Sequence, residues 1–224
     1  MSVKLTRASH ATAVALASVL ALSLPAPASA GGSPADAQSS SPPNDRIVID
    51  VETVNGSGCP AGTATVKVSP DNTEFRITYR KYRAEVGSGA DPTDLRKNCQ
   101  ISLEIHIPQG FTFAIAEAEY RGFLHLERGA SALERASYYF MGESDTAHVD
   151  HPFTGPFHGT WETTDSTPVA ELVFAPCGVT RNLNINTELR VNSGTSNPAA
   201  HSFMTMGSTE GSIDTIYHFH WKQC

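Results

Sequence analysis

The chain has 224 residues, with 16 Lys and Arg against 23 Asp and Glu, so its formal charge at neutral pH is −7. An acidic chain is a poor partner for nucleic acid or for an anionic membrane surface, and we expect neither as a ligand. The length is sufficient for one domain with a hydrophobic core.

The first thirty residues have the pattern of a secretory signal peptide. Lys4 and Arg7 form a positive start, an apolar stretch follows over residues 13–24, and Ala28-Ser29-Ala30 matches a small-residue cleavage site. The apolar stretch, at roughly 12 residues, is shorter than the ~20 that a membrane-spanning helix needs, and no later stretch is longer. The sequence therefore predicts a secreted, extracellular protein with no membrane span.

A change of composition separates the signal peptide from the folded part. Residues 31–45 are rich in Gly, Ser, Pro and Ala and have almost no large apolar side chains, which predicts a flexible linker. Residues 46–224 are then expected to form a single domain and to exist as a monomer. Without Lys4 and Arg7 the chain keeps 14 basic residues against 23 acidic ones, a formal charge of −9.

Alternation of apolar and polar side chains dominates residues 46–224, with turn signals between the alternating segments. This many short strands cannot bury their apolar faces in one flat sheet. We therefore predict an all-β fold, namely an antiparallel β-sandwich of the jelly-roll or immunoglobulin-like kind. A short helical turn is expected only at residues 130–136. Strands are predicted over residues 47–52, 63–68, 75–80, 101–107, 111–120, 122–127, 135–141, 158–163, 169–174, 183–191 and 213–221.

Four cysteines follow the predicted cleavage site, and an even number in an exported chain predicts two disulfides. Three pairings are possible. We predict Cys59 with Cys99 and Cys177 with Cys224, because each bridge then closes within one half of the chain. The alternative, a metal site of four thiolates, lacks the close Cys-x-x-Cys pairs that such sites use.

Short motifs are spread over nearly the whole of residues 46–224. They are Gly58-Cys59-Pro60, Gly62-Thr63, Arg96-Lys97-Asn98-Cys99-Gln100, Pro108-Gln109-Gly110-Phe111, Tyr120-Arg121-Gly122, Pro176-Cys177-Gly178, Asn186-Thr187 and Leu189-Arg190-Val191. In order and spacing the chain resembles the secreted proteins that carry the domain of unknown function 4360. The resemblance implies a small secreted β-rich domain. It implies no established activity, so it carries over no catalytic or binding residue.

Sequence motifs for enzymes are missing. The chain has no Gly-x-Ser-x-Gly nucleophile elbow, no His-Glu-x-x-His helix and no phosphate-binding Gly-rich loop. Glu117 and Glu119 lie on one face of a predicted strand, about 7 Å apart, a spacing within the range of glycosidase carboxylates. Glycosidase carboxylates flank the bond from opposite sides, however, so exposed strand carboxylates are the favoured interpretation and no catalytic residue is predicted.

Nine histidines make up the least ordinary part of the composition. His218 and His220 alternate on the final predicted strand, and such a pair binds a transition metal if a third ligand arrives from a neighbouring strand. The competing interpretation is that both rings face solvent while the aromatic residues between them pack into the core.

Aromatic and histidine side chains also gather in a segment that contains Pro and Gly, which we interpret as a loop. Exposed rings on a sandwich stack against sugars or anchor a protein partner, and function tends to lie on loops. The competing interpretation is that Phe157 or Trp161 belongs to the core. The candidate ligand-binding residues are His148, His151, Phe153, Phe157 and Trp161.

The leading hypothesis from these patterns is a secreted, non-enzymatic protein without a cofactor that binds an extracellular polysaccharide, the cell envelope or a protein partner, or has a structural role there. An alternative is a hydrolase or lyase acting on extracellular polymers, assisted by a metal bound to the histidines. A further alternative is a protease inhibitor, for which residues 87–94 near Cys99 are the exposed loop.

Overall fold

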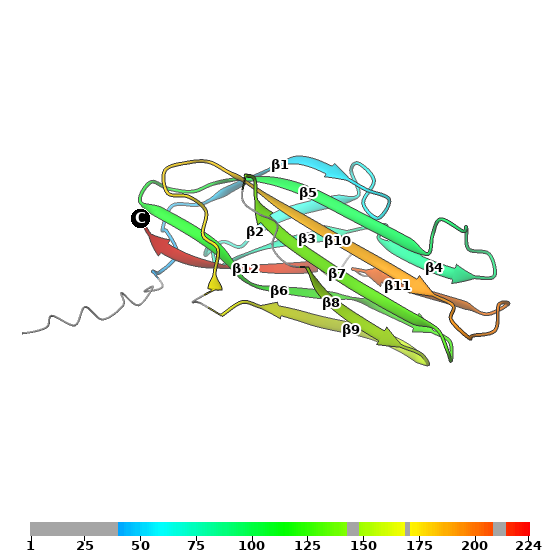
Figure 1. Cartoon of the computed structure of the whole chain (residues 1–224). Coiled ribbons are helices and arrows are strands. Elements are labelled where there is room, and N and C mark those ends of the chain that lie inside the picture. Colours follow the sequence, from blue (N-terminus) through cyan, green and yellow to red (C-terminus); the bar gives the residue numbers. More distant parts are fainter. Residues whose placement is uncertain (1–39, 143–147, 169–170, 208–213) are drawn as a thin grey trace, which may run out of the picture. The chain divides into compact units, whose positions relative to one another are not determined.

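Figure 1 shows the computed structural model, which describes residues 40–142, 148–168, 171–207 and 214–224. The predicted signal peptide and most of the predicted linker lie outside the described residues. The described part of the chain contains twelve strands and no α-helix, so no helix there is long and apolar enough to cross a membrane. The strands are β1 (Val48–Asn55), β2 (Ala64–Val68), β3 (Glu74–Tyr79), β4 (Arg83–Gly87), β5 (Arg96–His106), β6 (Phe111–Leu126), β7 (Ser131–Phe140), β8 (Val149–Thr154), β9 (Phe157–Ser166), β10 (Asn182–Asn192), β11 (His201–Met206) and β12 (Asp214–Gln223).

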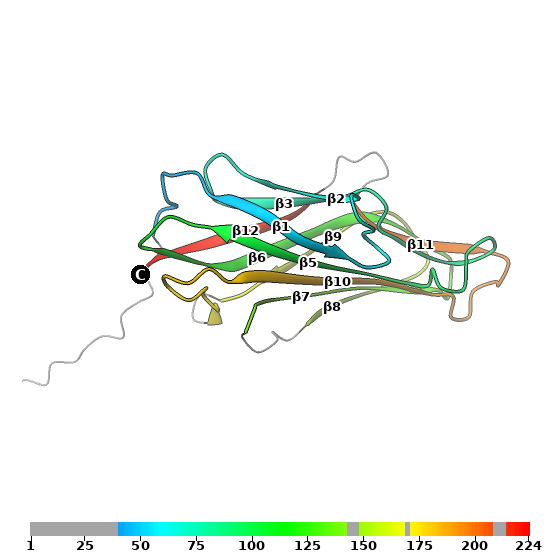
Figure 2. The same cartoon turned by 90° about the horizontal axis from the view of Figure 1, so that it is seen from above.

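The strands form two antiparallel sheets that pack as a sandwich, as predicted (Figures 1 and 2). The five-stranded sheet has the order β1-β5-β10-β7-β8. The seven-stranded sheet has the order β2-β3-β12-β6-β11-β4, and its seventh strand, β9, pairs with β6. β6 therefore pairs with three strands: β12 over its first half, β11 over its second half, and β9 over most of its length.

The core lies between the two sheets and is rich in aromatic rings. Phe75 stacks on Tyr217 with 4.9 Å between ring centroids, and Phe113 packs against Phe140 of the opposite sheet at 5.4 Å. In β3, Phe75 and Ile77 are buried and alternate with Arg76 and Thr78 on the other face, because successive side chains of a strand point to opposite faces. The period-two pattern of the sequence thus corresponds to the inner and outer faces of the sheets.

The structure differs from the predicted elements in three places. The helical turn at residues 130–136 is instead the start of β7, whose alanines alternate inward and whose backbone pairs with β10. The two strands predicted over residues 111–120 and 122–127 are one strand, β6. Residues 171–174 form no strand, and residues 169–170 lie outside the described part of the chain.

The sequence pattern missed three strands. β4 alternates charged residues with small ones and lies at a sheet edge. β8 contains Pro152, which is compatible with its place at the edge of the five-stranded sheet. β11 carries Met204 and Met206 on its buried face and Phe203 on its outer face, so its apolar residues do not alternate with polar ones.

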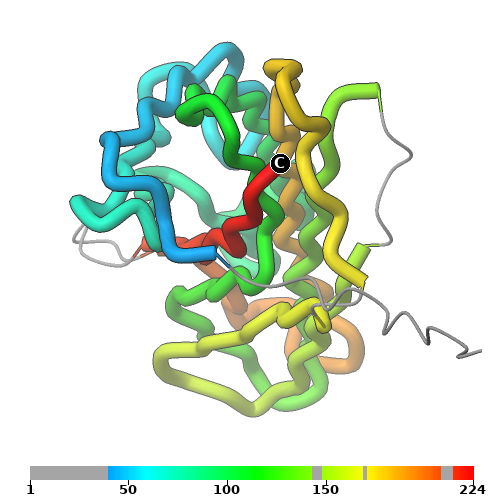
Figure 3. Tube along the Cα trace, turned by 90° about the vertical axis from the view of Figure 1, so that its left-hand side faces the viewer, coloured from blue at the N-terminus to red at the C-terminus, as the bar shows by residue number. Residues whose placement is uncertain are grey.

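Both predicted disulfides are confirmed. Cys59, after β1, is bonded to Cys99 in β5, and Cys177 is bonded to Cys224, which follows β12. The C-terminal end of the chain consequently lies beside the segment that carries Cys177 (Figure 3). Each bridge ties a stretch of irregular chain to the end or the middle of a strand.

We expect the double substitution Cys177→Ser and Cys224→Ser to lower the free energy of unfolding by about 2–4 kcal/mol, since the bridge closes a long loop in the unfolded chain. Urea denaturation monitored by tryptophan fluorescence measures this. An unchanged denaturation midpoint would show that the bridge is dispensable, and peptide mapping without reduction provides the control for the pairing in the parent protein.

Candidate functional site

The segment predicted as a ligand-binding loop consists of strands. Its first part is β8, which pairs with β7 in the five-stranded sheet, and its second part is the start of β9, which pairs with β6 in the seven-stranded sheet. The chain crosses from one sheet to the other at Gly155 and Pro156. His151 and Phe153 lie in β8, Phe157 and Trp161 lie in β9, and His148 directly precedes β8, so the five candidate side chains do not form one surface.

Trp161 lies in the core, as the competing interpretation of the sequence expected. Its side chain is 3% exposed, its Nε1 donates a hydrogen bond to the carbonyl oxygen of Thr205 at 3.0 Å, and its ring contacts Phe153 at 5.5 Å between centroids. Phe157 is 37% exposed, and His148 lies at the surface, 3.9 Å from Asp150. A stacking role for the Trp161 ring is incompatible with this burial.

His151 points inward and reaches a buried pair of carboxyl groups. Its Nε2 is 2.6 Å from Oδ1 of Asp165 in β9 and 3.9 Å from Oε2 of Glu134 in β7. Glu134 is fully buried at 0% exposure, and neither of its carboxyl oxygens has a hydrogen-bond partner within the described part of the chain. A polymer cannot reach a group at this depth, so the cluster is not accessible to a large substrate.

Burial dominates the electrostatics of this cluster. It raises the pKa of Glu134 to about 9, with the nearby Asp165 and Asp150 adding to the effect. Burial also raises the pKa of Asp165, against the opposing effect of His151. Three buried tyrosines, Tyr79, Tyr120 and Tyr217, face the same region from the seven-stranded sheet, and burial raises their pKa values as well. Glu134 is thus neutral in the folded protein over most of the pH range.

A different set of rings lies on the outer face of the seven-stranded sheet. Phe203 of β11 lies beside Phe123 and His125 of β6 and beside His201, with centroid distances of 6.0, 5.8 and 5.7 Å. Its plane is inclined to these three rings by only 22° to 36°. His158 of β9 stands nearly perpendicular to Phe123 and His125, at 86° and 84°. We call these five residues the aromatic platform.

Polar side chains border the aromatic platform. The Arg83 guanidinium lies over the Phe203 ring at 3.7 Å from its centroid, and Glu85 lies within hydrogen-bond distance of both Arg83 and His201. Glu127 lies 3.3 Å from His125 on the other side. The platform therefore combines partly exposed rings with charged hydrogen-bonding groups, an arrangement suited to a ligand with both apolar surface and hydroxyl groups.

Further along the same outer face, His218 of β12 meets two carboxylates of β6. Its Nε2 is 2.9 Å from Oε1 of Glu119 and 3.9 Å from Oε1 of Glu117. His220, predicted as the second member of a metal-binding pair, instead packs its ring against Phe174 at 5.8 Å. The two glutamates and His218 lie far apart in the sequence, and the structure brings them together.

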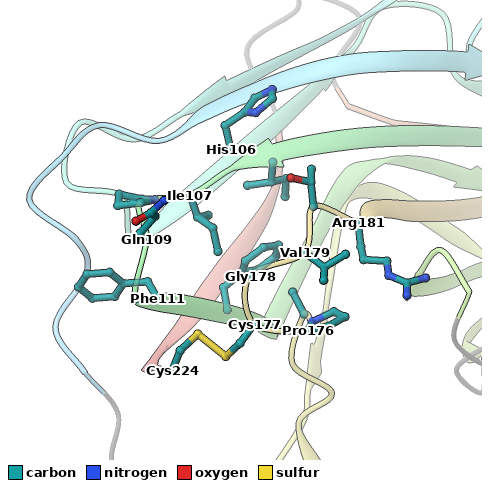
Figure 4. A pocket seen from close by; sticks show the side chains of 16 residues that line it. His106, Ile107, Gln109, Phe111, Pro176, Cys177, Gly178, Val179, Arg181 and Cys224 are labelled. Carbon is teal, nitrogen blue, oxygen red and sulfur yellow. A yellow bond between two sulfur atoms is a disulfide. The ribbon is translucent and has the colours of Figure 1, made fainter.

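A cavity of about 570 Å³ opens beside the Cys177–Cys224 disulfide (Figure 4). Its wall is largely apolar, with Ile107, Phe111 and Val179 among the lining residues. The only lining side chains that ionise are His106 and Arg181, and each already has a partner. His106 lies 2.9 Å from Asp50, and Arg181 donates to the carbonyl oxygen of Met141. This cavity brings no set of reactive groups together.

The two packed sheets and the two disulfides define a disulfide-linked β-sandwich protein. A relative from the fungus Arthroderma benhamiae, named an uncharacterized secreted protein, is 31% identical over 191 residues, which cover 85% of this chain and 77% of the relative. The chain belongs to the family of the domain of unknown function DUF4360, whose model matches residues 45–224. The predicted family and the predicted extracellular location are confirmed.

Among solved structures, the enzymatically active domain of tailspike protein 4 from bacteriophage CBA120 aligns with 77% of this chain at 10% identity. Only 19% of the tailspike chain is covered, and the TM-score is 0.26. A likeness of this size supports no conclusion about the activity of the present protein.

The buried carboxyl group makes stability depend on pH. A folded-state pKa near 9, against 4.5 for an ordinary glutamate, favours folding below pH 4.5, and this contribution is lost as the pH rises toward 9. We expect Glu134→Gln, which keeps the shape without the charge, to raise the melting temperature at pH 8 and to have little effect at pH 4. Melting curves of both proteins over this pH range measure the difference in melting temperature. A difference that stays the same at pH 4 and pH 8 would contradict the raised pKa of Glu134.

Proposed function

We propose that the protein binds an extracellular polysaccharide through the aromatic platform on the outer face of its seven-stranded sheet. The observation that carries the proposal is the arrangement of four side-by-side rings with the His158 ring standing at their edge. Sugar rings present C–H faces that pack on such aromatic surfaces, and their hydroxyl groups need hydrogen-bond partners at the border.

The surroundings of the platform support a saccharide rather than a purely apolar ligand. Arg83 supplies donors, while the carboxylates of Glu85 and Glu127 supply acceptors, all within one or two side chains of the rings. The rings sit on three adjacent strands, so the backbone pairing fixes their spacing before a ligand arrives. Fixed rings lose little conformational entropy on binding, which favours affinity for a weakly interacting polymer.

The sequence offers a matched control for this proposal. Phe157 is an exposed phenylalanine that was predicted to bind a ligand, and it lies only one residue from His158. Successive side chains of a strand point to opposite faces, so Phe157 and His158 of β9 are directed to different sides of the sheet. Replacing Phe157 removes a ring of equal chemistry without altering the platform.

We expect the mature protein to be retained on one or more of insoluble cellulose, chitin and bacterial cell walls, and Phe203→Ala to weaken this binding about tenfold, equivalent to roughly 1.4 kcal/mol. Phe157→Ala should bind as the parent protein does. Partition of the protein between pellet and supernatant at increasing polymer concentration measures the dissociation constants, and circular dichroism verifies that both variants are folded.

Two outcomes would contradict the proposal: no retention on any polymer, or an equal loss of binding in Phe157→Ala. Release of soluble oligosaccharides during the incubation would instead favour the hydrolase or lyase hypothesis. The assay therefore separates a binding protein from an enzyme acting on the same class of polymer.

A further inference from the structure

We propose that Glu117, Glu119 and His218 form a binding site for one divalent transition-metal ion such as Zn²⁺, separate from the aromatic platform. The three side chains each direct one ligand atom toward the others, and these atoms all lie within 4.8 Å of one another. Among the described residues no other group of three His, Cys, Asp or Glu side chains meets this condition.

The distances match what a small metal ion requires. Four ligands at 2.0–2.2 Å in a tetrahedron lie about 3.4 Å apart. Nε2 of His218 is 2.9 Å from one carboxylate oxygen and 3.9 Å from the other, so small side-chain rotations bring all three atoms to a common centre. The three side chains are half-buried, which leaves one side of the site accessible to water or to a ligand.

The backbone fixes these three positions. Glu117 lies directly opposite His218 in the pairing of β6 with β12, and the register shifts immediately after His218, between His218 and Phe219. A β-bulge of this kind turns a side chain relative to its neighbours and is common beside functional sites. The rings of Tyr217 and Phe219 on the inner face are buried in the core, and they hold the strand that carries His218.

The outward-facing atoms of all three proposed ligands already have partners. Ser166 donates to Oε2 of Glu117 at 3.0 Å, and Arg121 donates to Oε2 of Glu119. Nδ1 of His218 faces Oε2 of Glu74 at 3.6 Å. Metal-binding histidines characteristically direct their second nitrogen at a carboxylate, which sets the ring orientation. The three atoms left to face one another are the ones that would bind the ion.

Charge favours a cation at this place. Glu74, Glu117, Glu119 and Glu162 contribute four carboxylates. Arg76 pairs with Glu74, and Arg121 pairs with Glu119 and Glu162. With His218 neutral, these groups carry a formal charge of −2, which one divalent ion neutralises. One imidazole nitrogen with two carboxylate oxygens suits Zn²⁺ or Cu²⁺ better than Ca²⁺ or Mg²⁺, which prefer oxygen ligands alone.

A calorimetric titration of the metal-stripped mature protein with Zn²⁺ tests the site. We expect one equivalent to bind, and we expect His218→Ala and Glu117→Gln each to weaken binding at least tenfold. The matched control is His106→Ala: His106 also faces a carboxylate, Asp50 at 2.9 Å, but it lies in β5 of the other sheet. This variant should bind Zn²⁺ as the parent protein does.

Electron paramagnetic resonance of the Cu²⁺-loaded protein gives a second readout, because nitrogen ligands split the signal. We expect one imidazole nitrogen, and a signal from two would instead assign the ion to His218 and His220. The proposal is overturned if Zn²⁺ does not bind, if the His218 and Glu117 variants bind normally, or if the His106 variant loses binding equally. Polysaccharide binding by Phe203→Ala is measured in a separate assay. A negative result for the metal site therefore leaves the proposed polysaccharide binding to be judged by that assay alone.

Discussion

Strand β6 is the element on which the rest of the structure depends. It is the longest strand, and its backbone groups pair with β12, β11 and β9, so it holds together the two halves of the seven-stranded sheet. Its inner face contributes Tyr120 and Leu124 to the core, while its outer face carries Glu119 and Phe123. Both proposed sites are built on one rigid strand, which is why their side chains keep fixed spacing without a ligand.

One glycine in β6 allows the strands of the seven-stranded sheet to approach one another closely at this point. A Cβ atom on Gly122 would lie 1.8 Å from the carbonyl oxygen of Thr205 and 2.7 Å from Nε1 of Trp161, closer than atoms can approach. The space that Gly122 leaves is filled by the Trp161 ring, and the indole nitrogen then reaches the Thr205 carbonyl. The burial of Trp161 and the close approach of β11 to β6 are therefore two consequences of the same missing side chain.

The sequence predicts which face of a sheet a residue occupies better than it predicts which residues of adjacent strands meet. Alternation placed Glu117 and Glu119 on one face and His218 on an outward face, and the disulfide pairing followed from the positions of four cysteines. The meeting of Glu119 with His218 depends on the register of β6 with β12, which no local pattern encodes. Phe203 was missed because β11 has apolar residues on both faces, so its sequence does not alternate.

The buried Glu134 shows a second limit of sequence patterns. Alternation in β7 assigns it to the inner face, yet its residue type suggests solvent, and only its contacts resolve the conflict. Pairing with a cation is the usual way to bury a carboxylate, but among the described residues the basic group within 4 Å of Glu134 is His151, which already contacts Asp165. Burial raises the pKa of Glu134, so the carboxyl group is neutralised by protonation.

The proposed metal site and the aromatic platform share the outer face of β6, and their separation follows from strand geometry. Glu119 and Phe123 are four residues apart, which corresponds to about 14 Å along a strand. An extended polymer reaches across this distance, so a metal ion with an open coordination position would meet the same chain that packs on the rings. If both sites bind, Zn²⁺ should increase retention on the polymer in the parent protein and have no effect in His218→Ala, because coupling between the sites requires the ion.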